Sequence, residues 1–566
     1  MKAAVALLKR LNLTSAKLLL VVIVFITFFV NNRTIEPDIM ESRNLVTARE
    51  MVEKGNILVP TMNDELRFEK PPLPTWMSAV VEYALPDDIA AQRALAALAG
   101  VFLTLFFYRL CSRVLKVNPV WATIILCTCY NFMLMARTVS WDIYCHAFMM
   151  GGIYFFARAM TGDGRQLWRF VWAGVCAGLS LMSKGPVSLF ALFLPFILAF
   201  CLSFRPSVRG KWGGIALMAV IALAVGGWWY AYIHCFHADE LRSMINRESG
   251  AWMGRNVRPW HYYKLFFLEA GIWAVMFITS IFAIGFAWRR AGGRKALVPL
   301  FWTLFCLVLL SMIPEKKNRY LMPMLIPAAM LMAQTASYWT SLFRSGAATF
   351  RSALPFRINS WLLAAVCAGL PAAAWVMLVR PGYSGVLPIA VFAVISLCCC
   401  AVLAKSAVML RPGLMVGAVG IVYAAAVALA FPGAGKLINN PEMTGLDLTV
   451  GDTRLEGIPF RHNAAEELRI ELVYAARRDI KGLDLNDTAA VISAMPMAWL
   501  SHTGASELPQ AVLSRADTLH IGVYDCNRRP KGTRRYSQDF IYHLTLVTPK
   551  SAPVVQADSD AVLMNN

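Results

Sequence analysis

The chain has 566 residues, of which 58% are hydrophobic, and its mean hydropathy is +0.54. These values exclude an ordinary soluble globular protein. The formal net charge of +20 is compatible with nucleic-acid binding, but the basic residues stand between apolar segments and not on a soluble basic surface. We therefore expect contacts with the bilayer and with anionic lipid or a phosphate-bearing lipid substrate, and no nucleic-acid partner.

Apolar runs of membrane length recur along the chain up to residue 432. Runs of roughly 17–25 residues are long enough to cross a hydrocarbon core of about 30 Å as helices. The first run follows a basic start and has no small-residue cleavage site after it, which is typical of a retained signal-anchor helix. We predict about thirteen transmembrane helices, at residues 16–31, 93–112, 119–136, 141–160, 168–186, 187–204, 213–233, 263–288, 298–313, 321–341, 360–379, 386–404 and 414–432.

The distribution of Lys and Arg sets the predicted orientation. The amino terminus is basic, and so are the short loops that share its side of the membrane, so we place them in the cytoplasm. An odd number of spans then places everything after Pro432 on the outer, periplasmic face. Several outer loops are basic as well. Either the span count is wrong by one, or these cations hold an anion at the outer surface.

The composition changes after Lys436 to that of a soluble domain. The pattern predicts short strands and one helix, hence a small α/β domain without a recognisable catalytic motif. The expected strands are residues 446–450, 489–493, 519–524 and 540–547, and the expected helix is residues 464–478. The predicted domains are a membrane domain of residues 1–435, with a first periplasmic loop at 31–92, and a periplasmic domain of residues 436–566.

The segment between residues 35 and 76 is polar and rich in charged residues, although it follows a membrane span directly. Asp38 and Glu41 share one face if a helix begins near Pro37. A carboxylate at that place would act as a general base or stabilise positive charge that develops on a sugar. The alternative is a plain helix start, in which Glu41 pairs with Arg43 or Arg49.

The same segment ends in a stiff turn, Glu69-Lys70-Pro71-Pro72-Leu73-Pro74. Proline fixes φ and removes backbone donors, so this turn holds Lys70 rigidly near the membrane surface. An ammonium group in such a position suits a diphosphate or phosphodiester. The alternative is a capping turn between two surface helices.

Further charged groups stand at the predicted outer ends of other spans. Asp142 begins the span at 141–160, and Lys184 lies in the turn after the next span. The loop before the span at 321–341 carries Lys316, Lys317, Arg319 and Tyr320, which form either a phosphate clamp or a solvated loop.

Metal and cysteine chemistry receive little support from the sequence. His234 and His237 have only loose metal-ligand spacing, so we predict no metal site and no certain cofactor, with a divalent metal left open. The cysteines fall mostly in apolar segments without a CxxC pair, and we expect them to pack in the core.

Taken in this order and on one predicted face, these segments resemble the polyprenyl-phosphate-dependent glycosyltransferases of the GT-C fold. That group includes the protein O-mannosyltransferases and the bacterial lipid A aminoarabinose transferases. The resemblance covers residues 10–435. It rests on Arg49-Glu50-Met51, the turn from Glu69 to Leu73, Asp142, Lys184-Gly185-Pro186, and Lys316 with Tyr320 and Pro323. The oligosaccharyltransferase signature Trp-Trp-Asp-Tyr-Gly is absent from the sequence.

One position departs from the family pattern. The family usually has an Asp-Glu pair shortly before its Ala-Arg-Glu-Met run, and here the glutamate position is Glu41 whereas the aspartate position is Met40. Either Glu41 has taken the catalytic role, or Asp38 supplies the carboxylate from one helical turn earlier. We favour Glu41, with Asp142 in support.

The resemblance implies an all-α polytopic membrane enzyme with a small α/β periplasmic domain, located in the bacterial inner membrane. It would transfer a sugar from a polyprenyl-phosphate donor to a lipid A-like or other acceptor at the periplasmic face. Two groups of residues would form the site. The donor phosphate would be held by Lys70, Lys184, Lys316, Lys317, Arg319 and Tyr320, and the site would be shaped by Glu69, Pro71 and Pro72.

Two other functions remain possible at this point. The first is transfer to protein hydroxyls, as in the protein O-mannosyltransferases. The second, from another class, is a lipid transporter or flippase. A transporter accounts for the spans and the buried charges, but not for the polar outer segment, and the sequence shows no internal pseudo-repeat of the kind common in transporters.

Overall fold

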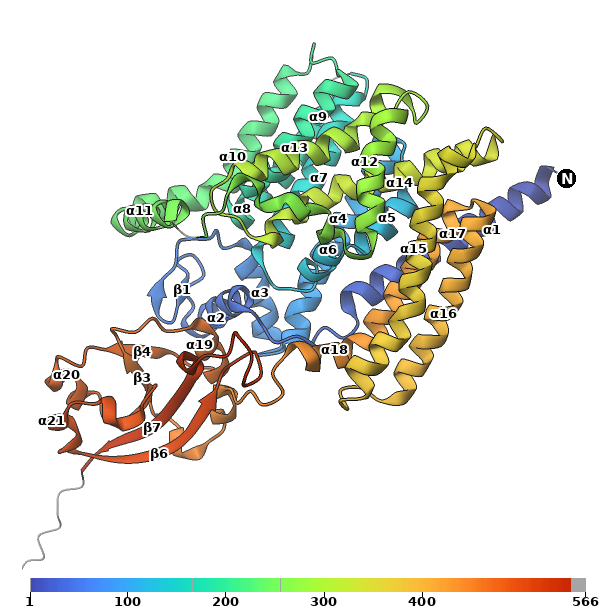
Figure 1. Ribbon diagram of the computed structural model, residues 1–566. Helices are drawn as coiled ribbons and strands as arrows, with labels where there is room; N and C mark the ends of the chain where they lie inside the picture. Colours follow the sequence, from blue (N-terminus) through green and yellow to red (C-terminus); the bar gives the residue numbers. More distant parts are fainter. Residues whose placement is uncertain (1, 165, 255, 551–566) are drawn as a thin grey trace, which may run out of the picture. The chain divides into compact units, whose positions relative to one another are not determined.

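The computed structural model describes residues 2–164, 166–254 and 256–550. The chain divides into two compact units, Met1–Leu437 and Ile438–Asn566 (Figure 1). Residues 551–566, which end the predicted periplasmic domain, lie outside the described part of the chain.

The first unit is built almost entirely from helices (Figure 1). Only one short hairpin interrupts this pattern in the described residues, formed by β1 (Thr61–Met62) and β2 (Glu65–Leu66). The α-helices are α1 (Lys2–Phe29), α2 (Ile39–Lys54), α3 (Leu73–Ala84), α4 (Ile89–Leu110), α5 (Pro119–Cys127), α6 (Tyr130–Met135), α7 (Trp141–Thr161), α8 (Leu167–Lys184), α9 (Leu194–Phe204), α10 (Trp212–Phe236), α11 (Ala238–Gly254), α12 (Ala274–Ala287), α13 (Val298–Met312), α14 (Met322–Arg344), α15 (Phe350–Ala374), α16 (Val386–Met409), α17 (Pro412–Ala425) and α18 (Phe431–Ile438).

Several helical segments of this unit have the length and composition of membrane spans. Within the described residues, 7 such segments are present: Ile89–Leu115, Trp212–Phe236, Trp260–Ala287, Gly293–Met312, Phe350–Val379, Val386–Met409 and Pro412–Ile438. Two shorter apolar helices cover Thr14–Phe29 and Leu189–Phe204. The expectation of a polytopic membrane protein is therefore confirmed, whereas the number of about thirteen spans stays a prediction.

The expected span at residues 119–136 does not form one continuous helix. It is divided into α5 and α6 at Thr128 and Cys129, both of which are buried. The Thr128 hydroxyl donates to the carbonyl of Ile124 at 2.7 Å and accepts the indole N–H of Trp273 at 2.8 Å. The interruption is thus stabilised by a polar contact inside the core, which apolar periodicity alone does not reveal.

The helices that position the site pack closely. Helix α7 packs against α4 and α8, and α8 packs against α10. Glycines allow the α8–α10 approach: a Cβ atom added at Gly178 would lie 2.6 Å from Cβ of Val225, and one added at Gly226 would lie 2.5 Å from Cβ of Leu181. Small residues at a crossing of this kind let two membrane helices approach each other. The carboxyl end of α8, where Lys184 lies, is thereby fixed.

The second unit contains a five-stranded mixed sheet with the strand order β4-β3-β5-β7-β6. Strand β3 is parallel to both of its neighbours, whereas β7 is antiparallel to β5 and β6. The strands are β3 (Phe460–Asn463), β4 (Ile480–Leu483), β5 (Met497–Ser501), β6 (Ala516–Asp525) and β7 (Ile541–Pro549), and the helices are α19 (Ile470–Ala476), α20 (Thr488–Ser493) and α21 (Gln510–Leu513). The core beneath β5 contains Met497, Trp499 and Val547.

The sequence-based assignment of this unit is right in part. The strands expected at 519–524 and 540–547 are present as β6 and β7, but the expected helix at 464–478 is reduced to α19. Residues 446–450 do not form a strand; Leu446–Thr449 form a 3-10 helix whose two end residues are buried. Residues 489–493 are helical because Asp487 caps α20, accepting the N–H of Ala490 at 3.0 Å.

Candidate active site

Asp38 begins the helix that follows α1 in the chain. Helix α2 starts at Ile39, and one carboxylate oxygen of Asp38 accepts the N–H groups of Met40 and Glu41, both at 2.9 Å. This is the geometry of an N-cap. The structure thus gives Asp38 the capping role that the sequence left open, and Met40 stands in the first turn of the helix, directly before Glu41.

Glu41 forms a buried ion pair with Arg93 of α4. The two side chains meet through two contacts, 2.9 Å and 2.7 Å, and the Glu41 carboxylate also accepts the N–H of Val139 at 3.0 Å. Arg93 donates in turn to the carbonyls of Asn32 and Ile35, at 2.6 Å and 2.7 Å. Glu41 and Arg93 are only 1% and 2% exposed. The pair therefore connects α2, α4, the chain before α2 and the chain before α7, and it differs from the predicted pairing with Arg43 or Arg49.

Glu50, from the Arg49-Glu50-Met51 run, holds the hairpin that follows α2. Its fully buried carboxylate accepts the hydroxyl of Thr61 at 2.6 Å and the N–H groups of Asn63 and Asp64. It also faces the ammonium of Lys54 at 3.4 Å. This part of the family resemblance thus has a structural explanation: the run fixes the hairpin that leads into the Lys70 turn.

Two tryptophans attach the chain before this hairpin to its surroundings. The indole N–H of Trp229 on α10 donates to the carbonyl of Leu58 at 2.9 Å, and that of Trp76 on α3 donates to the carbonyl of Ile57 at 2.7 Å. Both bonds use backbone carbonyls of an otherwise irregular segment. The position of the loop between α2 and β1 is therefore set from two different helices.

The turn from Glu69 to Leu73 joins β2 to α3 and carries charged groups on both sides. Pro71 and Pro72 are buried, and Pro72 is the residue before the first turn of α3. Glu69 contacts the guanidinium of Arg247 at 2.6 Å. Arg67 donates to the carbonyl of Arg43 and the hydroxyl of Thr47, both at 2.7 Å.

Lys70 lies in an environment that disfavours its charge. Burial lowers the pKa of Lys70, and the positive charges of Lys184 and Arg67 lower it further, against the opposing effect of Glu248 and Asp142. A cation in such surroundings is stabilised when an anion binds beside it. Lys70 therefore has the character expected of a phosphate-binding group.

Asp142 and Lys184 form a second buried ion pair. Asp142 lies in the first turn of α7, where the helix dipole favours a carboxylate, and its Oδ1 atom accepts a hydrogen bond from Nζ of Lys184. Its other oxygen, Oδ2, is buried and has no hydrogen-bond partner in the described part of the chain. After Lys184 the chain turns at Gly185, whose φ is +65° and whose added Cβ would lie 3.3 Å from the Tyr230 hydroxyl. That glycine lets α8 end directly after the lysine.

Tyr320 gathers three cations around its ring. The ammonium of Lys184 lies 5.6 Å from the ring centroid, that of Lys317 lies 5.8 Å away, and the guanidinium carbon of Arg319 lies 5.7 Å away. The Tyr320 hydroxyl donates to Glu315 at 3.3 Å, and Glu315 also contacts Lys317 at 2.6 Å. The Nε atom of Arg319 is buried without a partner among the described residues.

Lys316 is engaged with backbone groups. Its ammonium donates to the carbonyl of Arg258 at 3.0 Å and to that of Ile313, and only 4% of the residue is exposed. The neighbouring residues Val257 and Glu315 form an isolated β-bridge. Lys316 therefore joins the loop around residue 258 to the loop around residue 315, and its link to a bound phosphate stays a prediction.

The structure thus brings together Lys70, Asp142, Lys184, Arg319 and Tyr320, by direct contacts or through their electrostatic effects on one another. Asp38 caps α2 and Glu41 pairs with Arg93, and a catalytic role for either residue stays a prediction. Sequence reasoning missed Arg93 as the partner of Glu41, and it missed His146, whose buried Nδ1 atom has no partner in the described ranges. Both are ionisable residues inside predicted helical spans, which is a signal for function or buried pairing.

No described residues form a group of three or more His, Cys, Asp or Glu side chains that could hold a metal ion. His237 packs against Phe68, with 5.6 Å between the ring centroids, and His234 is exposed. The cysteines are present as free thiols.

The fold is similar to that of a solved crystal structure. The crystal structure described as ArnT from Cupriavidus metallidurans bound to undecaprenyl phosphate has a TM-score of 0.65, covers 94% of this chain and 97% of that chain, and is 16% identical in sequence. At this identity the likeness concerns the fold, and the expected GT-C fold is confirmed.

Sequence comparisons agree with this fold. A family described as dolichyl-phosphate-mannose-protein mannosyltransferase matches residues 69–230. An uncharacterized protein of Aquifex aeolicus is 27% identical over 54% of this chain and 61% of its own length. An undecaprenyl phosphate-alpha-4-amino-4-deoxy-L-arabinose arabinosyl transferase of Pseudomonas fluorescens is 26% identical over 53% of each chain. The chain thus spans between half and two thirds of the length of these relatives, and its similarity to polyprenyl-phosphate glycosyltransferases of the GT-C fold, expected from the motifs, is confirmed.

Proposed function

We propose that this chain is a multi-pass inner-membrane glycosyltransferase that moves a sugar from a polyprenyl-phosphate donor to a lipid A-like acceptor at the periplasmic face. One observation supports this function most directly. Asp142 is buried, one of its oxygens is held by Lys184, and the other has no partner in the described residues although it lies beside a cluster of cations. A free, oriented carboxylate oxygen next to cations suits glycosyl transfer from a phosphate, because the carboxylate can accept a proton while the cations stabilise the leaving phosphate.

In the proposed reaction, an acceptor oxygen attacks the anomeric carbon of the donor sugar. The bond between that carbon and the phosphate oxygen breaks, and its electron pair leaves with the polyprenyl phosphate. If the acceptor is a hydroxyl, its proton passes to Oδ2 of Asp142. Lys70, Lys184 and Arg319 stabilise the negative charge that grows on the leaving phosphate, and charge stabilisation of this type is usually the larger part of catalysis.

The other predicted site residues receive more limited roles in this proposal. Lys317 and Tyr320 complete the phosphate side of the site, and Lys316 contributes by fixing the loop on which they lie. Glu69, Pro71 and Pro72 hold Lys70 in position. Glu41 is assigned to positioning the chain before α7, through its contact with the N–H of Val139 at 3.0 Å, instead of acting on the sugar. Asp38 is assigned to capping.

Transfer to protein hydroxyls is the second candidate. It is favoured by the family match at residues 69–230, whose description names a protein mannosyltransferase and whose range includes Lys70, Asp142 and Lys184. A hydroxyl acceptor, on a lipid or on a protein, needs a base, whereas an ionised lipid phosphate does not. A strong requirement for the Asp142 carboxylate therefore indicates a hydroxyl, and the amount of sugar transferred to lipid A or to the peptide decides between the two acceptors.

The decisive experiment measures sugar transfer in proteoliposomes from a synthetic polyprenyl-phosphate sugar to lipid A or to a Ser/Thr-rich peptide, for the wild type and Asp142→Asn. The variant is expected to lose transfer by about 100-fold or more while it retains donor binding. Asp239→Asn, at an exposed position of α11, is the matched control and should transfer at the wild-type rate. Movement of the intact donor across the bilayer without transfer to any acceptor would instead establish the flippase alternative.

A further inference from the structure

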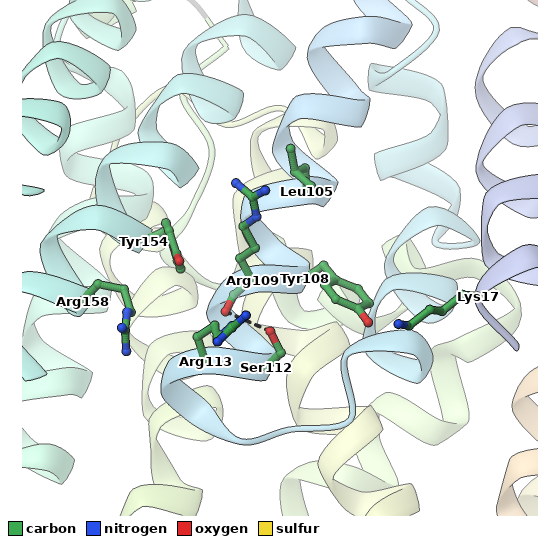
Figure 2. Close-up of a pocket in the computed structure, with 8 residues that line it drawn as sticks. All are labelled: Lys17, Leu105, Tyr108, Arg109, Ser112, Arg113, Tyr154 and Arg158. Atoms are coloured by element: carbon green, nitrogen blue, oxygen red, sulfur yellow. Dashed lines mark hydrogen bonds between the residues drawn. The ribbon is translucent and has the colours of Figure 1, made fainter. Parts of the chain in front are cut away.

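A basic cavity lies at the other end of the helices that carry the candidate active site (Figure 2). Its volume is about 610 Å³, within the usual range for ligand sites. Four cations line it: Lys17 on α1, Arg109 on α4, Arg113 in the π-helical turn Cys111–Leu115 that follows α4, and Arg158 on α7. Nothing in the proposed transfer reaction uses these residues.

The cavity and the candidate active site lie at opposite ends of the same helical layer, as two separate helices show. Asp142 and Arg158 lie at opposite ends of α7, and Arg93 and Arg109 lie toward opposite ends of α4. At a rise of 1.5 Å per residue, each pair is about 24 Å apart along its helix. This is close to the thickness of a hydrocarbon core, about 30 Å. The cavity therefore opens at the membrane face opposite Asp142.

The charge of this cavity is not balanced by the protein. No Asp or Glu lines it, and none of the four cations forms an ion pair with a carboxylate in the described part of the chain. Placement at the ends of helices on the expected cytoplasmic side explains why the three arginines occur there. It does not explain why residues from three separate helical segments surround one cavity of this size, where each like charge raises the cost of the others.

The surroundings of the cavity are partly apolar and face the bilayer. Leu105 lines it and is 44% exposed on a membrane-spanning helix. On α1, Leu18 and Val21 continue the exposed surface directly after Lys17, at 64% and 62% exposure. A ligand that fills the site therefore meets cations at one end and lipid-facing apolar side chains at the other.

We propose that this cavity binds the phosphate headgroup of an anionic phospholipid from the leaflet opposite the candidate active site. The headgroup phosphate would contact Arg109, Arg113 and Arg158, with Lys17 at the edge, and the acyl chains would run along Leu105 and the exposed face of α1. Tyr108 and Tyr154, which also line the cavity, offer hydroxyl groups to the glycerol portion. Basic cavities between membrane helices on the cytoplasmic side are suited to such headgroups.

The test measures lipid binding in the full-length protein and does not depend on sugar transfer. Protein in a zwitterionic detergent is titrated with phosphatidylglycerol or phosphatidylcholine, and bound lipid is counted by native mass spectrometry while the thermal midpoint is recorded. Wild type should retain phosphatidylglycerol in preference to phosphatidylcholine. The triple variant Arg109→Gln, Arg113→Gln, Arg158→Gln should bind phosphatidylglycerol at least about tenfold more weakly, the scale expected for losing several cations near an anionic headgroup.

A matched control removes the same charge elsewhere on the expected cytoplasmic side. The triple variant Arg290→Gln, Arg344→Gln, Arg351→Gln changes three exposed cations that do not line the cavity, and it should bind as the wild type does. If the cavity variant does not fold, Lys17→Gln at its exposed position is expected to weaken binding by about fivefold.

Three results would overturn the proposal. The first is wild-type lipid binding by the cavity variant, and the second is equal loss of binding in the control variant. The third is a thermal midpoint raised by inorganic phosphate alone as strongly as by phosphatidylglycerol, because the site would then serve a soluble anion. Failure of the proposed sugar transfer would leave all three measurements unaffected.

Discussion

Two buried carboxylate–cation pairs among the described residues of the first unit, Glu41–Arg93 and Asp142–Lys184, differ in whether every carboxylate oxygen has a hydrogen-bond partner. In the Glu41–Arg93 pair the carboxylate accepts two hydrogen bonds from the guanidinium and one from a backbone N–H. Arg93 also donates to two backbone carbonyls. In the Asp142–Lys184 pair one carboxylate oxygen is bound and the other has no partner in the described ranges.

This difference distinguishes an ion pair that stabilises the fold from one that belongs to the candidate active site. Burying a charged pair is costly, and a pair with every polar group satisfied repays that cost by holding segments together. A buried acceptor without a hydrogen-bond partner destabilises the fold. Its presence in a folded protein therefore needs another explanation, such as a ligand that donates a hydrogen bond to it. We therefore propose that the first pair is a structural connection and the second is part of the site, although the sequence favoured Glu41 as the catalytic carboxylate, with Asp142 in support.

The largest expected effect comes from breaking the first pair. Glu41→Gln removes the charge that Arg93 faces and leaves a buried guanidinium without compensation, which costs about 3–5 kcal/mol of folding stability. Thermal unfolding in detergent should show the loss directly. The double variant Glu41→Gln, Arg93→Met should recover much of it, because an apolar replacement of a buried pair is often tolerated. A stable Glu41→Gln protein with strongly reduced transfer would contradict this assignment and return Glu41 to a catalytic role.

The next effect concerns the second pair and appears in the reaction itself. Lys184→Met removes a cation that lies 5.6 Å from the Tyr320 ring and holds Asp142. Transfer should fall by about 100-fold or more, the usual loss when a group that stabilises developing charge is removed. Donor binding should weaken as well, which distinguishes this variant from Asp142→Asn. Lys211→Met, at a lysine that bonds the carbonyls of Met160 and Gly162, is the control and should keep donor binding.

A smaller effect is expected at Lys70. Lys70→Ala should weaken donor binding by about tenfold, the loss of one charge-assisted contact. Burial is the main cause that lowers the pKa of Lys70, so the protonated, binding form is lost as the pH rises through a value below the usual range of a lysine. Donor affinity should therefore decline in the alkaline range.

Lys70→Arg provides the control for the pH dependence, because arginine stays charged throughout this range. Its donor affinity should remain flat where that of the wild type declines. An identical alkaline decline in both proteins would assign the titration to another group.

The smallest effect distinguishes a cap from a catalytic carboxylate. Asp38→Ala should cost about 1 kcal/mol of stability, and Asp38→Asn should cost less, because asparagine also caps helices well. Transfer by Asp38→Asn should stay near the wild-type rate in the proteoliposome assay. A loss of transfer by 100-fold in a stably folded Asp38→Asn protein would restore Asp38 as the catalytic carboxylate in place of the missing aspartate at Met40.

The sequence predicted the helical architecture well because apolar length and periodicity are local properties. It also placed Asp142, Lys184 and Tyr320 at corresponding helix ends, and the structure brings these residues together. It did not reveal that Arg93, far along the chain, is the partner of Glu41, because the choice among several nearby arginines depends on packing.

In the second unit, too, pairing between separate segments of the chain could not be predicted from the sequence. Its strands β3, β4 and β5 are short and lie far apart in sequence, so the parallel pairing of β3 with both neighbours leaves little local pattern. The α20 segment, in contrast, has a strong N-cap in Asp487, a signal that was present in the sequence and that apolar content outweighed in the prediction. Capping residues deserve more weight than apolar content in segments this short.

The two indole contacts to the loop between α2 and β1 have a consequence for motion. The backbone carbonyls of Ile57 and Leu58 are bound by Trp76 and Trp229, while the side chains of these two residues are 56% and 39% exposed. Displacing this segment alone would break two hydrogen bonds, each worth about 1 kcal/mol. Any displacement that keeps both bonds would therefore have to carry α3 and the end of α10 along with the loop.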